Sequence, residues 1–115
     1  MNIVRMNKLM RDRAMEQEYK YGCTFTNYQC EPEEYFRRLK EKLAEEVTEF
    51  LEDQTVEELG DILEVLYALA AYKGYTAKQL DEVAENKRAK FGAFEQRLVL
   101  KEVRHTNDCP RSKKR

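Results

Sequence analysis

Two long segments with the apolar spacing of an amphipathic helix stand almost end to end in the middle of the chain. The first begins at Pro32, which suits the first turn of a helix, and ends at Asp53. The second begins after Thr55, a residue that can cap a helix, and ends before Gly74. Because few residues separate them, they are predicted to fold back as an antiparallel hairpin. The apolar positions of the first segment are Tyr35, Phe36, Leu39, Leu43, Val47, Phe50 and Leu51.

Length and charge limit what this hairpin can belong to. A chain of 115 residues is one domain with a thin core. Its 21 Lys and Arg residues nearly balance its 22 Asp and Glu residues, so the net charge is −1 and local patterning must carry the electrostatics. Nucleic acid is not expected as a partner, because a short basic end such as this one more often only solubilises. Without an apolar leader or 18 consecutive apolar residues, the protein is predicted to be cytoplasmic with no membrane partner. Its three cysteines lack CxxC spacing and are interpreted as free thiols.

Two further helices are expected beside the hairpin. One covers residues 7–19, and the other begins at Thr76 and stops at Gly92. The second helix of the hairpin, DILEVLYALAAY at residues 61–72, is apolar nearly all round, which is more than a two-helix hairpin can bury. Self-association is therefore expected, with a four-helix bundle formed between subunits.

Two short segments are candidates for strands. The runs CTFTNYQ (23–29) and FEQRLVLKEV (94–103) alternate as strands do, and they are candidates to pair with each other. Residues 1–104 then form one domain, which is all-α apart from this minor two-stranded piece. Residues 105–115 are polar and basic, and they are predicted to be a disordered tail.

Acidic residues crowd the same region that carries the most regular apolar pattern. Residues 42–66 hold nine carboxylates and one lysine. At about 100° per residue, Glu46 lies within the apolar stripe of its helix, and Glu49 lies at the border of the stripe one turn later. Glu58 and Asp61 repeat this spacing on the second helix. The hairpin therefore directs two pairs of acids toward one space.

Carboxylates that converge beside an apolar seam repel one another and lose hydration, so they either bind protons or hold cations. A set of oxygen ligands without histidine suits Mg²⁺ or Mn²⁺ better than Zn²⁺. The alternative is a solvated or salt-bridged face. Glu58 has a structural role available, since Thr55-x-x-Glu58 is a capping box, and a base from another helix could satisfy Glu46. Spacing alone leaves both interpretations open.

A family resemblance enters at these acids. EEVTE (45–49) followed by ELGD (58–61) resembles the paired acidic motifs of the all-α nucleoside triphosphate pyrophosphohydrolases, the MazG-like superfamily. NKLMRDR (7–13) is similar to the opening motif of its phosphoribosyl-ATP pyrophosphohydrolase-like branch, and KFGAF (90–94) is similar to the closing motif. The resemblance covers most of the chain.

The resemblance implies an antiparallel helix bundle completed by oligomerisation, as a homodimer or homotetramer. It also implies a Mg²⁺-dependent enzyme that converts a nucleoside triphosphate to a nucleoside monophosphate and pyrophosphate, with Mn²⁺ as a possible substitute. By position, the implied metal ligands are Glu46, Glu49, Glu58 and Asp61. Glu46 and Glu49 are the implied catalytic acids, Glu46 taking the proton of the attacking water. The implied phosphate contacts are Lys8, Arg11, Asn86 and Lys87.

Three functions remain open from the sequence. The first is house-cleaning hydrolysis of standard or modified nucleoside triphosphates, and the second is hydrolysis of phosphoribosyl-ATP by the same mechanism. The pair Gly92-Ala93, where the family usually has two glycines, leaves the substrate open. The third is a non-catalytic helical module whose acidic surface docks a basic partner.

Overall fold

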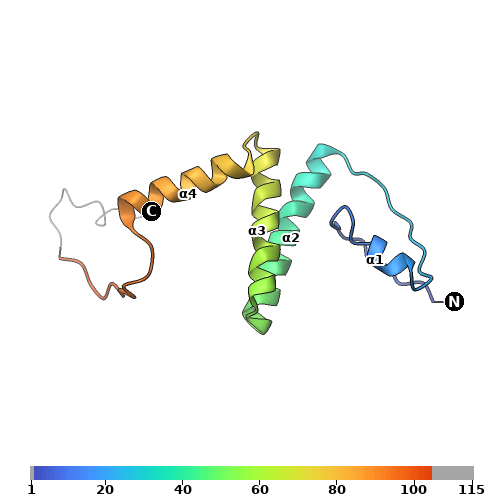
Figure 1. Cartoon of the computed structure of the whole chain (residues 1–115), viewed down its shortest axis with the longest axis horizontal. Coiled ribbons are helices and arrows are strands. Elements are labelled where there is room, and N and C mark those ends of the chain that lie inside the picture. Colours follow the sequence, from blue (N-terminus) through green and yellow to red (C-terminus); the bar gives the residue numbers. More distant parts are fainter. Residues whose placement is uncertain (1, 105–115) are drawn as a thin grey trace. The chain divides into compact units, whose positions relative to one another are not determined.

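The computed structural model describes residues 2–104 and contains four helices in that range (Figure 1). They are α1 (Glu16–Tyr19), α2 (Pro32–Asp53), α3 (Val56–Tyr72) and α4 (Ala77–Phe91). Within the described residues there is no strand, which confirms the all-α class. The chain divides into two compact units, Met1–Glu82 and Val83–Arg115. The tail predicted for residues 105–115 lies outside the described residues.

Helices α2 and α3 form the predicted antiparallel hairpin and pack side by side (Figure 1). Pro32 occupies the first turn of α2, as the sequence predicted. The helix ends where Gln54 turns into the left-handed region at φ 60°, and its backbone N–H donates to the carbonyl of Phe50. This sharp stop lets α3 begin two residues later and run back along α2. The buried side chains of the described residues are Leu39, Glu46, Val65 and Ala70.

Thr55 starts α3 through a capping box with Glu58. The backbone N–H of Glu58 donates to Thr55 Oγ1, and the N–H of Thr55 donates to Glu58 Oε1 at 3.3 Å. Thr55 Oγ1 also donates to Glu58 Oε1 at 2.9 Å. The cap satisfies N–H groups that the first turn of a helix leaves unpaired, so it fixes where the second arm of the hairpin begins.

Thr55→Ala is expected to lower the free energy of unfolding by about 1 kcal/mol, because it removes both hydroxyl contacts of the cap. The measurement is urea unfolding followed by circular dichroism. Thr48→Ala is the matched control, since the Thr48 hydroxyl donates to the carbonyl of Ala44 inside α2 and caps nothing. Its effect should be close to zero, because alanine favours the helix. Equal losses in both variants would contradict a capping role for Thr55.

Aromatic side chains close the opposite end of the hairpin. Phe36 of α2 stacks on Tyr72 of α3 with 4.5 Å between ring centroids and 1° between ring planes. Tyr35 meets the same Tyr72 ring edge-on, and the ammonium of Lys40 lies 4.4 Å from the centre of the Phe36 ring. The hairpin is thus fixed by the cap at its turn and by this stack at its open end.

The predicted helix over residues 7–19 is wrong for most of its length. Helix α1 covers Glu16–Tyr19, and residues 7–11 are irregular. Asn7 has a left-handed φ of 46°, and its backbone carbonyl and Oδ1 both accept hydrogen bonds from Arg38 of α2. Contacts with the hairpin therefore override a weak local helical preference.

The predicted strand pair is also wrong. Residues 23–29 and 94–103 contain no strand, and neither segment has a strand partner within the described residues. Alternating side chains suit a sheet surface, yet a strand is stable only when its backbone groups pair with a neighbour. The alternation alone could not supply that neighbour.

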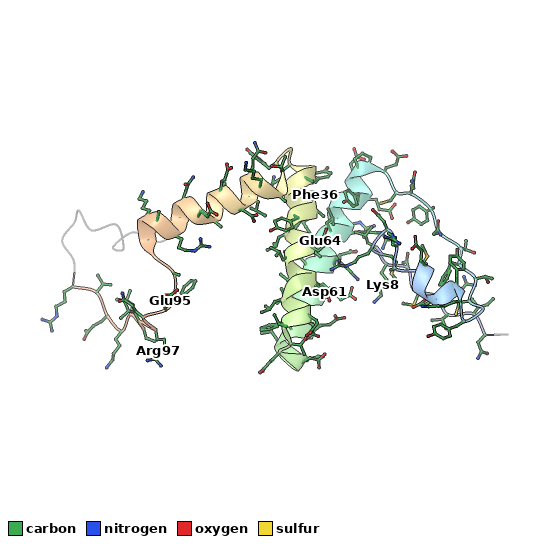
Figure 2. All side chains as sticks on the ribbon, in the orientation of Figure 1. Lys8, Phe36, Asp61, Glu64, Glu95 and Arg97 are labelled. Carbon is green, nitrogen blue, oxygen red and sulfur yellow. The ribbon has the colours of Figure 1, made fainter. Side chains whose placement is uncertain are left out.

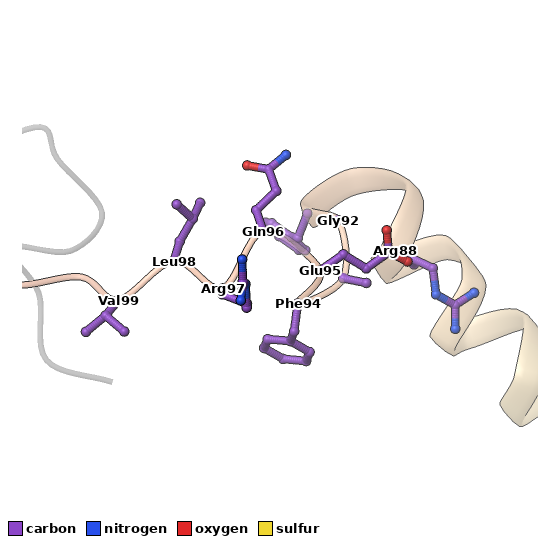
Figure 3. A pocket seen from close by; sticks show the side chains of 10 residues that line it. Arg88, Gly92, Phe94, Glu95, Gln96, Arg97, Leu98 and Val99 are labelled. Carbon is purple, nitrogen blue, oxygen red and sulfur yellow. The ribbon is translucent and has the colours of Figure 1, made fainter.

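The second unit begins within α4, which ends at Phe91 as Gly92 adopts a positive φ of 81°. The end of α4 and the chain that follows surround an open hollow of about 620 Å³ (Figure 3). Phe94, Leu98 and Val99 line this hollow and are largely exposed. Among the described residues, no helix is long and apolar enough to cross a membrane.

Candidate metal centre

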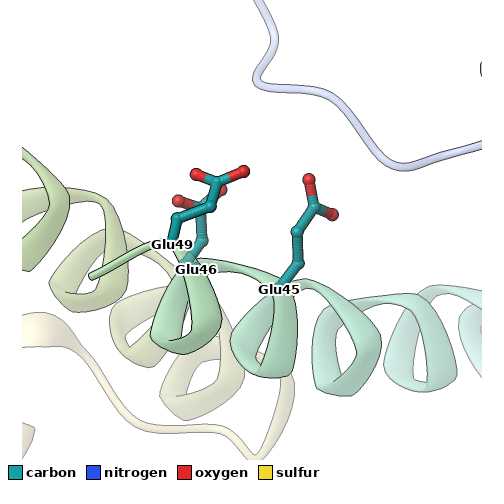
Figure 4. A group of neighbouring side chains, drawn as sticks. All are labelled: Glu45, Glu46 and Glu49. Atoms are coloured by element: carbon teal, nitrogen blue, oxygen red, sulfur yellow. The ribbon is translucent and has the colours of Figure 1, made fainter. Parts of the chain in front are cut away.

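Three glutamates on neighbouring turns of α2 form an acidic cluster. Each of Glu45, Glu46 and Glu49 offers a carboxylate oxygen, and these oxygens lie within 4.8 Å of one another (Figure 4). Spacings of three and four residues on a helix place side chains on one face, which brings Glu49 beside the other two. The structure thus groups two of the predicted ligands, Glu46 and Glu49, and adds Glu45.

Glu46 is the member of the cluster that is buried. The residue is 7% exposed. Oε1 lies 3.5 Å from the ammonium of Lys42, one turn earlier, while Oε2 is buried and has no hydrogen-bond partner among the described residues. A buried carboxylate oxygen without a partner is costly, so the cluster is short of positive charge.

The pKa of Glu46 also indicates a shortage of positive charge around this residue. Burial is the main cause that raises the pKa of Glu46, and the charge of Glu49 raises it further. Lys42 opposes this rise, and Asp61, across the hairpin on α3, adds to it. A divalent cation would supply the missing charge to these oxygens. The donor set is all carboxylate oxygen, which fits Mg²⁺ or Mn²⁺.

The other two predicted ligands have partners of their own. Asp61 is half-buried, and its Oδ1 accepts from Arg11 Nη2 at 2.7 Å. Glu58 lies in the first turn of α3, where its Oε1 accepts from Thr55 in the capping box. The capping role explains Glu58 without a metal. Metal binding by Glu58 and Asp61 stays a prediction, with Asp61 favoured because its charge reaches Glu46.

Lys8 and Arg11, which are predicted to contact phosphate, each pair with an acidic side chain of the hairpin. Lys8 Nζ donates to Glu45 Oε1 at 2.9 Å, while Arg11 pairs with Asp61 on the other helix. Figure 2 labels Lys8 in the N-terminal segment and Asp61 on α3. The hydrogen bond between Lys8 and Glu45 is the main cause that raises the pKa of Lys8 and lowers that of Glu45. Lys8 therefore lies at the acidic cluster on α2, and Arg11 lies at Asp61 on α3.

The other predicted phosphate contacts belong to the second unit. Asn86 and Lys87 are exposed on α4, beyond the boundary at Val83, and their role stays a prediction. Sequence reasoning missed Glu45 and Lys42. Lys42 was detectable, since it precedes Glu46 by one turn, but the Glu45 contact depends on a distant segment.

Comparison with known proteins returned no match. No protein-family model, no curated protein and no solved structure matches the chain. The resemblance to the MazG-like superfamily therefore stays a prediction, and the functional proposal rests on the carboxylates themselves.

Proposed function

We propose that this protein is a Mg²⁺-dependent nucleoside triphosphate pyrophosphohydrolase, with Mn²⁺ as an alternative ion. The observation that carries the proposal is the buried, unpartnered Oε2 of Glu46 inside a three-glutamate cluster. Soluble helices often display acids, but they seldom bury one without a partner. The substrate class, a nucleoside triphosphate, is inferred from the resemblance of the sequence motifs to the MazG-like superfamily.

The cluster can do the chemistry that such a reaction requires. A nucleoside triphosphate carries about four negative charges, and bare carboxylates would repel it. When bound, Mg²⁺ neutralises such charge and activates water for in-line attack. Glu46 would then be the base that takes the proton of the water, and Glu49 would help to hold the ion. The bond between the α- and β-phosphates breaks, leaving a nucleoside monophosphate and pyrophosphate.

Lys8 and Arg11 are the proposed phosphate contacts of the first unit. Their charged groups already lie at Glu45 and Asp61, at the edge of the cluster. Charge that develops on the departing pyrophosphate would be stabilised by these two groups. Arginine can do this with two parallel N–H donors, and lysine acts as a point charge.

We also propose that a second copy of the chain completes the bundle, as a homodimer or homotetramer. Within the described residues, the buried apolar side chains are Leu39, Val65 and Ala70, which is a small core for a hairpin of this length. On α3, more than one-third of the surface is exposed for each of Leu59, Leu63 and Leu66. An apolar face of this kind is normally covered by another surface.

The test is release of pyrophosphate from a panel of nucleoside triphosphates that includes phosphoribosyl-ATP, with Mg²⁺, with Mn²⁺ and with chelator. Hydrolysis should require the metal and fall roughly 100-fold or more in Glu49→Gln. Glu52→Gln is the matched control, because Glu52 lies on the same helix, is exposed and stands outside the cluster. It should keep its activity.

Two outcomes would redirect the proposal. Turnover of phosphoribosyl-ATP alone would make that compound the substrate and leave the mechanism intact. Absence of hydrolysis together with absence of Mg²⁺ binding would favour a non-catalytic module that docks a basic partner through its acidic face.

A further inference from the structure

The irregular segment of residues 7–11 is attached to the hairpin through side chains. We call it the strap. Lys8 pairs with Glu45 of α2, Arg11 pairs with Asp61 of α3, and Asn7 accepts from a guanidinium of α2. Within the described residues, no backbone–backbone hydrogen bond joins the strap to either helix. The strap is therefore held by two ion pairs and by two hydrogen bonds from Arg38 to Asn7, and its Leu9 is partly buried.

These attachments differ in strength along the strap. Arg38, which holds Asn7, is 14% exposed in its side chain and is also fixed by Glu34 at 2.7 Å. Lys8 and Arg11 are 40% and 56% exposed, and ion pairs of this kind are weak and screened by salt. The strap thus has a firm attachment at Asn7 and two weak ones after it.

The two weak attachments lie at the place where a cation would bind. Glu45 belongs to the acidic cluster, and Asp61 adds its negative charge to the surroundings of Glu46. A divalent cation at the cluster would attract these carboxylates and repel the ammonium of Lys8 and the guanidinium of Arg11. Metal and strap therefore compete for Glu45, and Arg11 at Asp61 adds positive charge near the same site.

We propose that residues 7–11 are a releasable strap: Lys8 and Arg11 neutralise Glu45 and Asp61 while no divalent cation is bound, and a bound divalent cation frees both. Arg38 keeps the start of the strap in place, so the freed cations stay beside the cluster. There they are available to the anionic phosphates of the substrate. This inference rests on the proposed function, because it requires metal binding at the cluster.

The test is nuclear magnetic resonance relaxation of the backbone amides of residues 8–11 in the full chain, with chelator and then with Mg²⁺. The native order parameters should fall from about 0.85 toward 0.6 when Mg²⁺ is added. In the double variant Lys8→Gln with Arg11→Gln they should be low in both conditions. The same variant should bind Mg²⁺ several-fold more tightly in calorimetry, since it lacks two of the competing cations and keeps only Lys42.

Two controls separate charge from a general loss of structure. Exchanging the two cations, Lys8→Arg with Arg11→Lys, keeps both charges and should restore the native order parameters and affinity. Arg37→Gln removes an exposed ion pair with Glu41 elsewhere on α2 and should change neither. If the native chain binds Mg²⁺ but the double variant binds it no more tightly, or if the strap stays ordered, the strap is overturned and the proposed function stands. A native chain that binds no Mg²⁺ overturns both.

Discussion

Glu46→Gln should make the metal-free protein more stable at neutral pH and abolish its stabilisation by Mg²⁺. The carboxylate of Glu46 is buried, one oxygen lacks a partner, and neighbouring acids oppose its charge. An amide of nearly the same size removes that charge and can also donate a hydrogen bond. The expected gain is about 1 kcal/mol in the free energy of unfolding with chelator present. Hydrolysis should fall by about 10²-fold or more.

The stability of the native chain should depend on pH through the same residue. Because burial raises the pKa of Glu46 in the folded protein, the folded state binds a proton more readily than the unfolded chain. The stability that this proton contributes is complete below the ordinary value of 4.5 and is lost as the pH rises through the raised value. Glu46→Gln should not show this loss of stability. The free energies of unfolding of the two proteins should therefore be similar in acid and should differ increasingly toward neutral pH. Urea unfolding over a pH series with chelator measures the divergence.

Glu52→Gln is the control for both parts of this prediction. It removes one acid from the same helix at an exposed position. Its free energy of unfolding, the pH dependence of that energy and its stabilisation by Mg²⁺ should all stay close to those of the native protein. A Glu46→Gln protein that is less stable than native at neutral pH would mean that the carboxylate is well paired. The proposed metal centre would then no longer be supported by a buried carboxylate oxygen without a partner.

The hairpin could be predicted because its signals are local. Apolar spacing, Pro32 and the capping residue Thr55 each act within a few residues of one another, and the structure begins α2 and α3 where these signals placed them. The end of α4 before Gly92 follows the same logic. Local chemistry was enough to determine where these helices begin and end.

The segments that were predicted wrongly depend on distant partners. Asn7 takes its left-handed conformation where Arg38, 31 residues away, binds its carbonyl and side chain. The alternating runs at 23–29 and 94–103 required a neighbouring strand that the described chain does not provide. Neither helical spacing nor alternation of side chains in a short segment indicates which distant residues the segment will contact.

The candidate site was half predictable for the same reason. Helical spacing brought Glu46 and Glu49 together, and the structure confirms that grouping. The same spacing places Glu45 one turn before Glu49, so its place in the cluster was predictable although it lies off the apolar stripe. Its contact with Lys8 was not predictable, because Lys8 lies in a segment 37 residues away. Spacing left two roles open for Glu58, and the capping box confirms the structural one.

Leu39→Ala should be the most damaging single truncation in the hairpin. Leu39 is the least exposed apolar side chain of the described residues, at 3%, and few others share the core. Truncating a buried leucine to alanine costs about 2–5 kcal/mol, which is a large part of the stability of a domain this small. Thermal unfolding followed by circular dichroism should show a much lower midpoint or no cooperative transition.

The same experiment, repeated at several protein concentrations, tests whether a second copy covers α3. If it does, the native midpoint should rise with concentration, because association stabilises the folded chain. Leu63→Ala should then also be destabilising, although Leu63 is partly exposed on a single chain. A midpoint that is independent of concentration, with Leu63→Ala harmless and Leu39→Ala severe, would mean that the hairpin stands on its own core. The exposed leucines of α3 would then need another explanation than self-association.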